Sequence, residues 1–227
     1  MCGRYTLHHK PVEIEERFEV ETNLELFEPR YNIAPTQMVP VVRHPRSGDE
    51  TREVAPCKWG LIPYWATDPK IGNKLINAKA ETIAEKPSFK HSFAKRRCLI
   101  PADGFYEWEK RGKEPSQPFY IRRRDGGLFA FAGLYEGWRT PEGALLESCT
   151  IITVEPNELL SKIHNRMAAI LRPEEEAAWI DPKSKMEDLL RMLRPYEPDE
   201  LEAIPVSRVV NSPAQDIPEC ITPIQAA

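Results

Sequence analysis

The density of prolines is the feature of this sequence that most restricts its fold. The chain has 22 prolines against 11 glycines in 227 residues. A proline fixes its own φ angle and cannot donate a backbone hydrogen bond, so it disfavours the interior of long helices and of central strands. We therefore expect many fixed turns and short elements rather than a few long helices.

Short apolar runs between these breaks predict a mainly β structure. Strand-like segments lie at residues 2–7, 38–43, 52–61, 97–100, 105–108, 119–123, 128–134, 148–154 and 201–210. Turns are expected at residues 30–36, 47–49, 101–104, 125–127 and 141–143. Because Pro40 lacks a backbone N–H, the strand at 38–43 is expected at a sheet edge or a bulge.

Helical patterns are confined to short segments. They lie at residues 12–20, 157–162, 173–180 and 185–193. Pro11 and Pro173 stand where a first helical residue is favoured, and glutamates follow each of them near the positive end of the helix dipole. We expect the helix at 12–20 to be a framework element.

The composition excludes several classes of protein. The length and the 41% hydrophobic content fit one globular domain with a substantial core. No apolar run approaches a membrane span, and the start of the chain lacks the layout of a secretory signal, so we expect a cytoplasmic protein. The five cysteines contain no C-x-x-C pair, which argues against a disulfide framework or a zinc knuckle. Cys57, Cys98 and Cys149 lie in apolar runs and are expected to pack as small hydrophobic side chains.

Common catalytic and nucleotide-binding signatures are missing from the sequence. There is no G-x-x-x-x-G-K-[ST] loop, no H-E-x-x-H, no G-x-S-x-G and no internal repeat. The sequence therefore indicates neither a cofactor nor a metal ion.

The second residue is a cysteine, and an initiator methionine is normally removed before so small a residue. We expect Met1 to be cleaved, so that Cys2 begins the mature protein. Such a residue carries an α-amine with a pKa of about 7.7–8.0 beside a thiol with a pKa of about 8.5. The amine can condense with an aldehyde to an imine, and the thiol can close on the same carbon to give a thiazolidine ring. The alternative is a cysteine without function on a frayed chain end.

The segment from Lys70 to Arg97 is the most basic part of a chain whose net charge is −4. Trp65, Phe89 and Phe93 are interleaved with its cations. A run of charges is usually only a solvated face. Cations mixed with aromatic residues, however, are typical of a groove that binds phosphates and stacks on nucleic acid bases.

Three polar residues have both a structural and a functional interpretation. Asn77 could be a turn or cap residue. Glu107, among aromatic residues, either points to solvent or lies in an apolar pocket with a raised pKa, ready for proton transfer. His164 enters just before an apolar run, where a structural histidine is commoner than a catalytic one.

Six motifs occur in order along the chain. They are Cys2-Gly3-Arg4-Tyr5, Tyr31-Asn32-Ile33-Ala34-Pro35-Thr36, Trp59-Gly60-Leu61-Ile62-Pro63, Ile76-Asn77-Ala78-Lys79-Ala80-Glu81, Pro101-Ala102-Asp103-Gly104-Phe105-Tyr106-Glu107-Trp108 and Ile163-His164-Asn165-Arg166-Met167. Together with Val209-Val210-Asn211, they resemble the SRAP family, the SOS response-associated peptidases, which include proteins that shield abasic sites in DNA.

The resemblance implies a fold and a reaction. The fold would be a single compact α+β domain over residues 1–227, dominated by antiparallel strands with peripheral helices. The reaction would be a self-limiting crosslink between Cys2 and the ring-opened aldehyde of an abasic site in single-stranded DNA. Autocatalytic removal of Met1 and strand cleavage by β-elimination would be side activities of the same terminus.

The resemblance also implies roles for individual residues. Cys2 would form the crosslink, with Asn77 beside it, Glu107 as the acid and base, and His164 as a second proton-transfer or orienting group. Phosphates would be held by Arg4 and by Lys79, although the family more often has arginine at the second position. Apart from the resemblance, we expect Trp65 and Trp108 to be the aromatic contacts to the strand.

The motif around His164 departs from the family pattern. The family usually has aspartate where Asn165 stands and proline where Ala168 stands. Losing the acid could lower the pKa of His164, and losing the proline could loosen the loop. We expect the rate of the step that depends on His164 to be affected.

Two alternative functions use fewer of these features. An N-terminal cysteine amidohydrolase or peptidase needs Cys2 and a base but no basic aromatic groove. A non-catalytic single-strand-binding module needs Trp65 and the lysines, and Cys2 would be irrelevant. Our main expectation is a monomeric cytoplasmic protein that associates with the nucleoid when it binds abasic single-stranded DNA.

Overall fold

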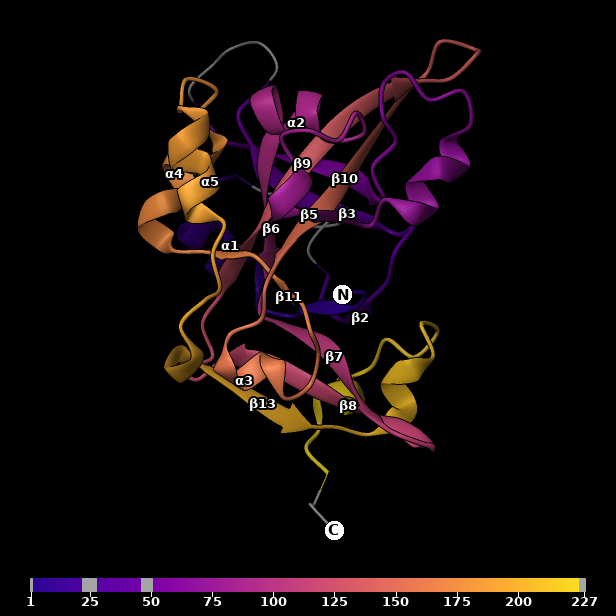
Figure 1. Cartoon of the computed structure of the whole chain (residues 1–227), viewed down its shortest axis with the longest axis vertical. Helices are drawn as coiled ribbons and strands as arrows, with labels where there is room; N and C mark the ends of the chain where they lie inside the picture. Colours follow the sequence, from indigo (N-terminus) through magenta and orange to yellow (C-terminus); the bar gives the residue numbers. More distant parts are fainter. Residues whose placement is uncertain (1, 22–27, 46–50, 225–227) are drawn as a thin grey trace.

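Two β-sheets carry the fold, and the chain passes between them. The computed structural model describes residues 2–21, 28–45 and 51–224. The expected turn at 47–49 and the expected removal of Met1 lie outside the described residues. Figure 1 shows the larger sheet in the upper half of the molecule and the smaller one below it.

The smaller sheet is antiparallel, with strand order β13-β8-β7-β1-β2. Its strands are β1 (Tyr5–Leu7), β2 (Arg30–Ile33), β7 (Gly104–Arg111), β8 (Glu114–Arg123) and β13 (Leu201–Pro205). In this sheet β1 lies between β2 and β7, with Tyr5 paired to Ile33 on one side and to Phe105 on the other. The N-terminal strand is therefore held on both edges.

The larger sheet closes on itself. Its strands are β3 (Met38–Arg43), β4 (Glu53–Trp59), β5 (Asn77–Lys79), β6 (Arg97–Ala102), β9 (Phe129–Arg139), β10 (Leu145–Val154), β11 (Met167–Ala168) and β12 (Ile170–Leu171). The pairing runs β10-β4-β3-β6-β9, and β9 pairs again with β10. A closed ring has no exposed edge along these strands, so its backbone groups are satisfied internally.

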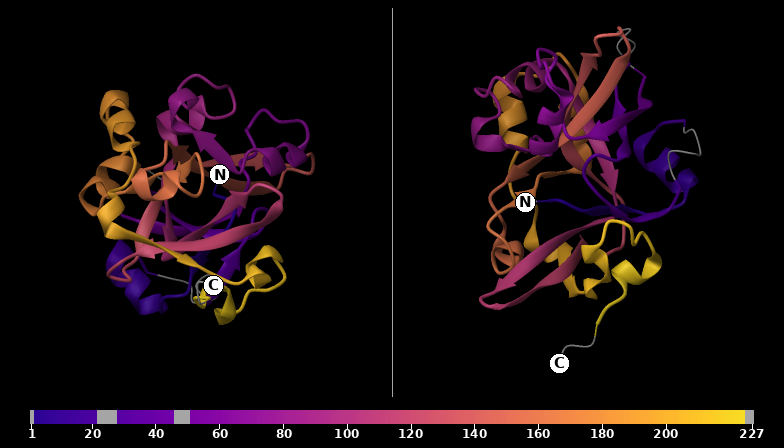
Figure 2. Two further views of the ribbon diagram at one scale, coloured as in Figure 1. Left: turned by 60° about the horizontal axis from the view of Figure 1, so that its bottom comes forward. Right: turned by 90° about the vertical axis from the view of Figure 1, so that its right-hand side faces the viewer.

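Short helices lie on the outside of the sheets, as the views of Figure 2 show. They are α1 (Pro11–Phe18), α2 (Lys90–Lys95), α3 (Glu158–Ser161), α4 (Pro173–Ile180) and α5 (Met186–Met192). Between them run 3₁₀ turns, η2 (Pro69–Lys74), η3 (Ala80–Thr82), η4 (Pro198–Glu200), η5 (Arg208–Asn211) and η6 (Pro218–Ile221). None of the helices in the described ranges is both long and apolar enough to cross a bilayer.

Aromatic side chains join the two sheets into one core. The ring of Tyr5 contacts those of Trp59 and Phe131, with centroids 5.4 and 5.9 Å apart, and Phe105 contacts Phe131 at 5.8 Å. Each fully buried side chain of this size contributes roughly 1.5–3 kcal/mol. The α+β class with mainly antiparallel strands is confirmed.

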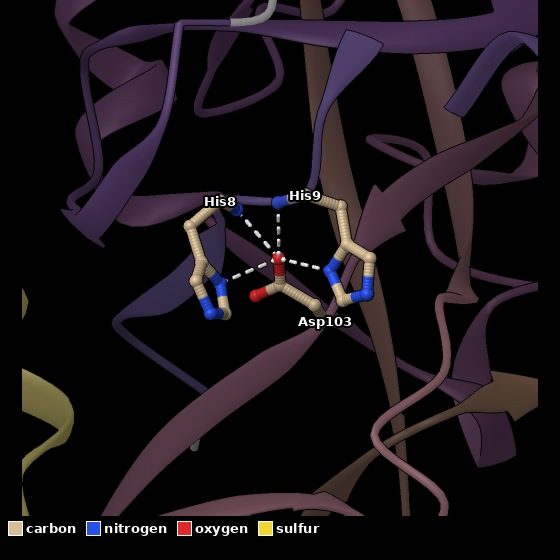
Figure 3. Close-up of side chains that lie close together, drawn as sticks. All are labelled: His8, His9 and Asp103. Atoms are coloured by element: carbon tan, nitrogen blue, oxygen red, sulfur yellow. Dashed lines mark hydrogen bonds and ion pairs between the residues drawn. The ribbon is translucent and has the colours of Figure 1, made fainter. Parts of the chain in front are cut away.

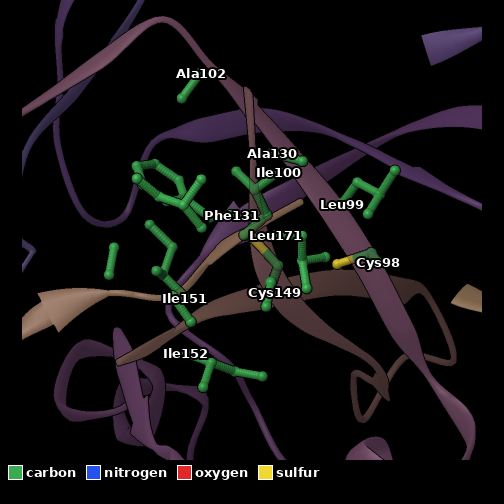
Figure 4. Close-up of a cluster of buried hydrophobic side chains, with 14 of the residues drawn as sticks. Cys98, Leu99, Ile100, Ala102, Ala130, Phe131, Cys149, Ile151, Ile152 and Leu171 are labelled. Atoms are coloured by element: carbon green, nitrogen blue, oxygen red, sulfur yellow. The ribbon is translucent and has the colours of Figure 1, made fainter. Parts of the chain in front are cut away.

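The free cysteines of the strands belong to this core. Cys57, Cys98 and Cys149 are fully buried and unbridged, as predicted. Figure 4 shows Cys98 and Cys149 among leucine, isoleucine and phenylalanine side chains. They act as small hydrophobic residues.

Some predicted boundaries are wrong because distant residues decide them. Residues 30–33 form β2 rather than a turn, since β1 pairs with them and the Asp216 carboxylate accepts the amides of Tyr31 and Asn32. Strand β3 is interior, not at an edge, but it meets β6 only at Val42, so the N–H that Pro40 lacks costs no ladder bond there.

Two predicted segments have other bounds in the structure, and one helix has no counterpart among the predictions. The segment 201–210 is a strand only to Pro205, where β13 ends and the chain soon enters η5. Helix α2, in the basic segment, was not predicted. The expected turn at 101–104 is reduced to one residue, Asp103, because β6 runs on to Ala102 and β7 begins at Gly104.

Asp103 is the joint between the two sheets, and its buried carboxylate binds the end of β1 (Figure 3). One carboxylate oxygen accepts the Thr6 hydroxyl. The other accepts the backbone amides of His8 and His9, at 2.5 and 3.1 Å, and faces both Nδ1 atoms, at 2.7 and 3.1 Å. Burial alone would raise the pKa of Asp103, but these bonds outweigh it and hold the pKa well below its ordinary value.

Gly104 makes room for this arrangement. A Cβ at this position would lie 2.2 Å from the ring of Tyr120. That ring must come close, because the Tyr120 hydroxyl lies 3.1 Å from Thr6 Oγ1. Steric crowding by Tyr120 therefore explains why the motif has a glycine at position 104.

Replacing Asp103 by asparagine is expected to destabilise the protein. The amide cannot supply the charge that the donors on β1 face, and buried donors left unsatisfied cost roughly 1–3 kcal/mol each. Urea denaturation at pH 7 measures the loss. As a control, Asp125→Asn alters an exposed turn carboxylate and should change the free energy of unfolding by less than about 0.5 kcal/mol.

The same variant should alter the pH dependence of stability. The hydrogen bond to Asp103 raises the pKa of His9 in the folded state. A raised histidine pKa stabilises the fold fully below the unfolded value of about 6.5, and this contribution is lost as the pH rises through the folded value. The difference in stability between wild type and Asp103→Asn should therefore be larger at pH 6 than at pH 9. A constant difference would contradict this assignment.

Candidate functional site

Cys2 lies three residues before the start of β1 and is fully buried. Its thiol contacts the carbonyl of Arg4 at 3.8 Å, and its own carbonyl accepts the Asn77 side-chain amide at 2.8 Å. Asn77 begins β5, which lies parallel to β10 of the larger sheet. The two residues therefore come together from different sheets.

Glu107 lies on β7 next to this pair. Its side chain is only 2% exposed, which decides between the two interpretations of its position in favour of the buried one. Burial raises the pKa of Glu107 to about 7. Burial raises the pKa of the Cys2 thiol strongly, and the nearby Glu107 carboxylate raises it further. Glu107 is thus a buried acid that can exchange a proton at neutral pH.

His164 follows α3 in a loop fixed by its backbone and its neighbours. Asn157 caps α3 by accepting the Leu160 amide at 2.9 Å, and its side-chain amide donates to Tyr196. The ring nitrogen Nδ1 of His164 lies 3.1 Å from the Arg166 amide and 3.2 Å from its carbonyl. In either tautomer Nδ1 therefore has a backbone partner. Nε2 is the ring nitrogen that can exchange a proton with a bound molecule.

The cavity beside His164 holds about 280 Å³. Glu109 and Lys110 of β7 line it together with Lys162 and Asn165. Burial lowers the pKa of His164, and Lys110 lowers it further, so the imidazole is mainly neutral at pH 7. The structure brings Cys2, Asn77 and Glu107 together and puts His164 at a neighbouring cavity.

The residues that depart from the family pattern occupy different surroundings. Asn165 is exposed at the cavity, whereas Ala168 is buried in β11 and pairs with Thr153. The loop between them is held by Arg166, which binds Glu81 through two bonds of 2.6 and 2.9 Å and the Thr153 carbonyl at 2.6 Å. These contacts hold the loop in the absence of the proline.

Arg4 contacts the C-terminal part of the chain. Its guanidinium donates to the Asn32 side chain at 2.9 Å and to the carbonyls of Val210 and Asn211 at 2.7 and 3.2 Å. Asn32 in turn donates to the carbonyls of Val210, Ser212 and Gln215. Arg4 therefore has a structural role, whether or not it also binds a phosphate.

The other predicted DNA contacts differ in exposure. Lys79, at the end of β5 and two residues from Asn77, is exposed. Trp65 is 46% exposed, which excludes a core role for its ring, and its neighbour Tyr64 is 56% exposed. Trp108 is partly buried and donates its indole N–H to Asn211 at 2.8 Å.

The basic segment divides into surface and core. Phe89 and Phe93 are buried and cannot stack on bases, and Arg97 is buried under α4. We expected three aromatic rings among the cations to be accessible to bases. This prediction is wrong for Phe89 and Phe93, and only Trp65 is exposed. The reason is that α2 packs Phe93 inward against Trp179, a pairing that the charges around it obscure.

Comparison with known proteins shows the family of this chain. The family model for SOS response associated peptidase (SRAP) matches residues 1–213. The chain belongs to the SRAP family. It is 46% identical to the abasic site processing protein YoqW of Bacillus subtilis over 97% of this chain and 99% of the relative. It is 33% identical to the mouse abasic site processing protein HMCES, over 98% of this chain and 76% of the mouse protein.

A solved structure has the same fold as this SRAP protein. A crystal structure of a Bacteroides thetaiotaomicron protein covers 98% of this chain and 100% of its own, with a TM-score of 0.89 and 27% identity. The two-sheet arrangement is thus shared with an experimentally determined structure.

The sequence analysis does not include two features near the candidate site. One is the ion pair of Arg166 and Glu81, for which the opposite charges in two of the motifs are a signal. The other is Lys110 at the His164 cavity, for which the sequence carries no signal.

One cluster of possible metal ligands occurs within the described ranges. His8, His9 and Asp103 place ligand atoms within 4.8 Å of one another. The Asp103 carboxylate is, however, already surrounded by the hydroxyl and amide donors of β1 and its continuation. This donor set suits a structural carboxylate better than a metal ligand.

Glu107→Gln should change the pH dependence of stability in a defined direction. A buried acid with a raised pKa loses stability as the pH rises from the unfolded value of about 4.3 toward the folded value. The stability of the glutamine variant relative to wild type should therefore increase up to the folded pKa of about 7 and level off above it. Urea denaturation between pH 5 and 9 measures this. A difference that is independent of pH would contradict a buried, titrating Glu107, and a strong effect of salt on it would indicate a surface charge instead.

Proposed function

We propose that this protein recognises abasic sites in single-stranded DNA and binds to them covalently through Cys2, which shields the lesion. The observation that carries the proposal is the grouping of Cys2 with Asn77 and the buried acid Glu107. It is supported by the relatives YoqW and HMCES, both named abasic site processing proteins. The proposal requires removal of Met1, and we propose that the protein acts as a monomer.

The first step uses the α-amine of Cys2. The amine nitrogen bonds to the aldehyde carbon of the ring-opened sugar, and loss of one water gives an imine. Asn77 holds the Cys2 carbonyl and so fixes the direction of the amine. Glu107 accepts a proton from the attacking amine and returns one to the departing hydroxyl, a double role suited to a pKa of about 7.

The second step closes the ring. The Cys2 sulfur bonds to the imine carbon, and the thiol proton passes to the imine nitrogen. Because burial raises the pKa of this thiol, it is not ionised in advance. Glu107 accepts the thiol proton as the C–S bond forms, which gives sulfur its thiolate character, and delivers that proton to the imine nitrogen. The product is a thiazolidine, which hydrolyses much less readily than an imine.

The imine is a branch point between protection and cleavage. Without ring closure, removal of a proton from the sugar would lead to β-elimination and a cut strand. We propose that His164, neutral and held through Nδ1, exchanges protons with the sugar through Nε2. Lyase activity and autocatalytic removal of Met1 are side activities in this scheme.

Intact mass spectrometry tests the crosslink directly. The purified protein should lack Met1, and with abasic single-stranded DNA it should gain the mass of one strand minus one water. Cys2→Ala keeps an α-amine but cannot close the ring, so it should give only an imine that borohydride traps. A stable adduct of Cys2→Ala without borohydride would contradict the thiazolidine.

Controls separate this reaction from the alternatives. Cys220→Ala removes a buried cysteine that contacts the Gln215 carbonyl, and it should leave the adduct unchanged. Intact strands should give no adduct. Equal binding of intact and abasic strands with no mass gain would favour a simple binding module, and hydrolysis of amide substrates without DNA binding would favour an amidohydrolase.

Lys79→Ala should reduce the salt dependence of binding to single strands. Each phosphate contact contributes a slope of about −0.7 to log affinity against log salt, so the slope should become shallower by roughly that amount. Lys185→Ala removes another exposed lysine, at the start of α5, and should leave the slope unchanged. Fluorescence anisotropy between 50 and 300 mM salt measures both. Equal slopes for Lys79→Ala and wild type would remove Lys79 from the interface.

Trp65→Ala tests the aromatic part of the interface. If the exposed ring stacks on a base, its loss should cost about 1–3 kcal/mol of binding with little dependence on salt. Because the ring is 46% exposed, thermal stability should change little. Unchanged affinity would exclude stacking by Trp65.

A further inference from the structure

A second basic site lies away from Cys2, between α2, the start of β6 and the end of α4. A cavity of about 350 Å³ is lined there by His44, Lys95, Arg96, Arg97 and Tyr135, among others. None of the described residues that line it is acidic. In a chain with a net charge of −4, this is a local excess of positive charge.

Arg97 is the central group of this cavity. Its side chain is only 3% exposed, and four hydrogen bonds tie it to main-chain carbonyls of Phe93, Ala94, Trp179 and Asp181. A guanidinium has five N–H donors, so one on Nη2 remains. Neutral carbonyls satisfy the donors without neutralising the charge. Burial accordingly lowers the pKa of Arg97 to about 10.

Three nearby carboxylates are engaged by other cations. Buried Glu136 binds Arg96, His91 and Ser92. Glu53 and Glu147 bind Arg43, whose guanidinium stacks 4.4 Å from the centroid of Tyr135. The charge of Asp181 acts on Arg97 and offsets part of the effect of burial, but within the described ranges no carboxylate forms an ion pair with Lys95 or Arg97. A buried cation without an ion-pair partner is costly, and an anion in the cavity would offset that cost.

We propose that this cavity is an anion-binding site that takes a phosphate group. A phosphate would supply a negative charge beside Arg97 and Lys95, and its oxygens can accept hydrogen bonds from several N–H donors at once. The cavity volume is at the lower end of the range for small-molecule sites. It can hold a phosphate group and part of the organic group esterified to it. The phosphate can come from a free nucleotide or from a DNA strand.

The site is separate from the one around Cys2. Arg97 begins β6, and Ala102 at its other end adjoins Asp103, which holds β1. At about 3.3 Å per residue, the strand separates the two ends by roughly 17 Å. In Figure 1, α2 lies at the top of the molecule, and the smaller sheet with β7 lies in the lower half.

Titration with inorganic phosphate tests the site. Backbone amide shifts of Arg96, Arg97 and Tyr135 should move saturably in NMR spectra at low salt. Lys95→Glu should weaken binding by about tenfold or more, the loss expected for one charge-assisted contact. Lys90→Glu makes the same charge change at the exposed start of α2, outside the cavity lining, and should weaken binding less than about twofold.

Two organic phosphates identify the source. If a deoxynucleoside 5′-monophosphate moves the same amides at lower concentration than inorganic phosphate, the site binds nucleotides. If only a 5′-phosphorylated decathymidylate does so, the site binds the end of a strand. Shifts scattered over the surface, or equal losses in Lys95→Glu and Lys90→Glu, would overturn the proposal. None of these results depends on the crosslinking chemistry of Cys2.

Discussion

The position of Cys2 depends on the buried carboxylate of Asp103. β1 has only three residues, too few to be held by its ladder bonds alone. Asp103 stands where the chain leaves the larger sheet for the smaller, and it binds Thr6, His8 and His9 at that point. The same carboxylate therefore anchors the strand that presents Cys2 and fixes the joint from which β7 carries Glu107 toward it.

Two acids four residues apart have opposite properties because their surroundings differ. Asp103 is buried among donors, so hydrogen bonds overcome desolvation and keep it ionised. Glu107 is buried where desolvation prevails, so its proton is held near neutral pH. The pKa values of the two carboxyl groups are separated in this way, so that Asp103 is ionised at neutral pH and Glu107 can exchange a proton there.

The sequence was sufficient for features that depend on local pattern or on whole motifs. The strand at 38–43, the helix at 173–180 and the burial of Cys98 follow from periodicity and apolar character. The sequence was insufficient where a distant residue decides the secondary structure. Strand β2 is an example, because the amide of Asn32 donates to Asp216, 184 positions later. The burial of Glu107 was left open because an alternating strand places an acid equally well inside or outside until the opposite layer is known.

Arg4 links the two ends of the chain, and this has a consequence for synthesis. The Arg4 guanidinium donates to the carbonyls of Val210 and Asn211, 206 and 207 positions later. Translation adds about 5–20 residues per second, so roughly 10–40 s separate the emergence of Arg4 from that of these partners. During that interval Arg4 can reach only its third acceptor, the side chain of Asn32. The segment beside Cys2 therefore gains its full set of contacts only when almost the whole polypeptide has left the ribosome.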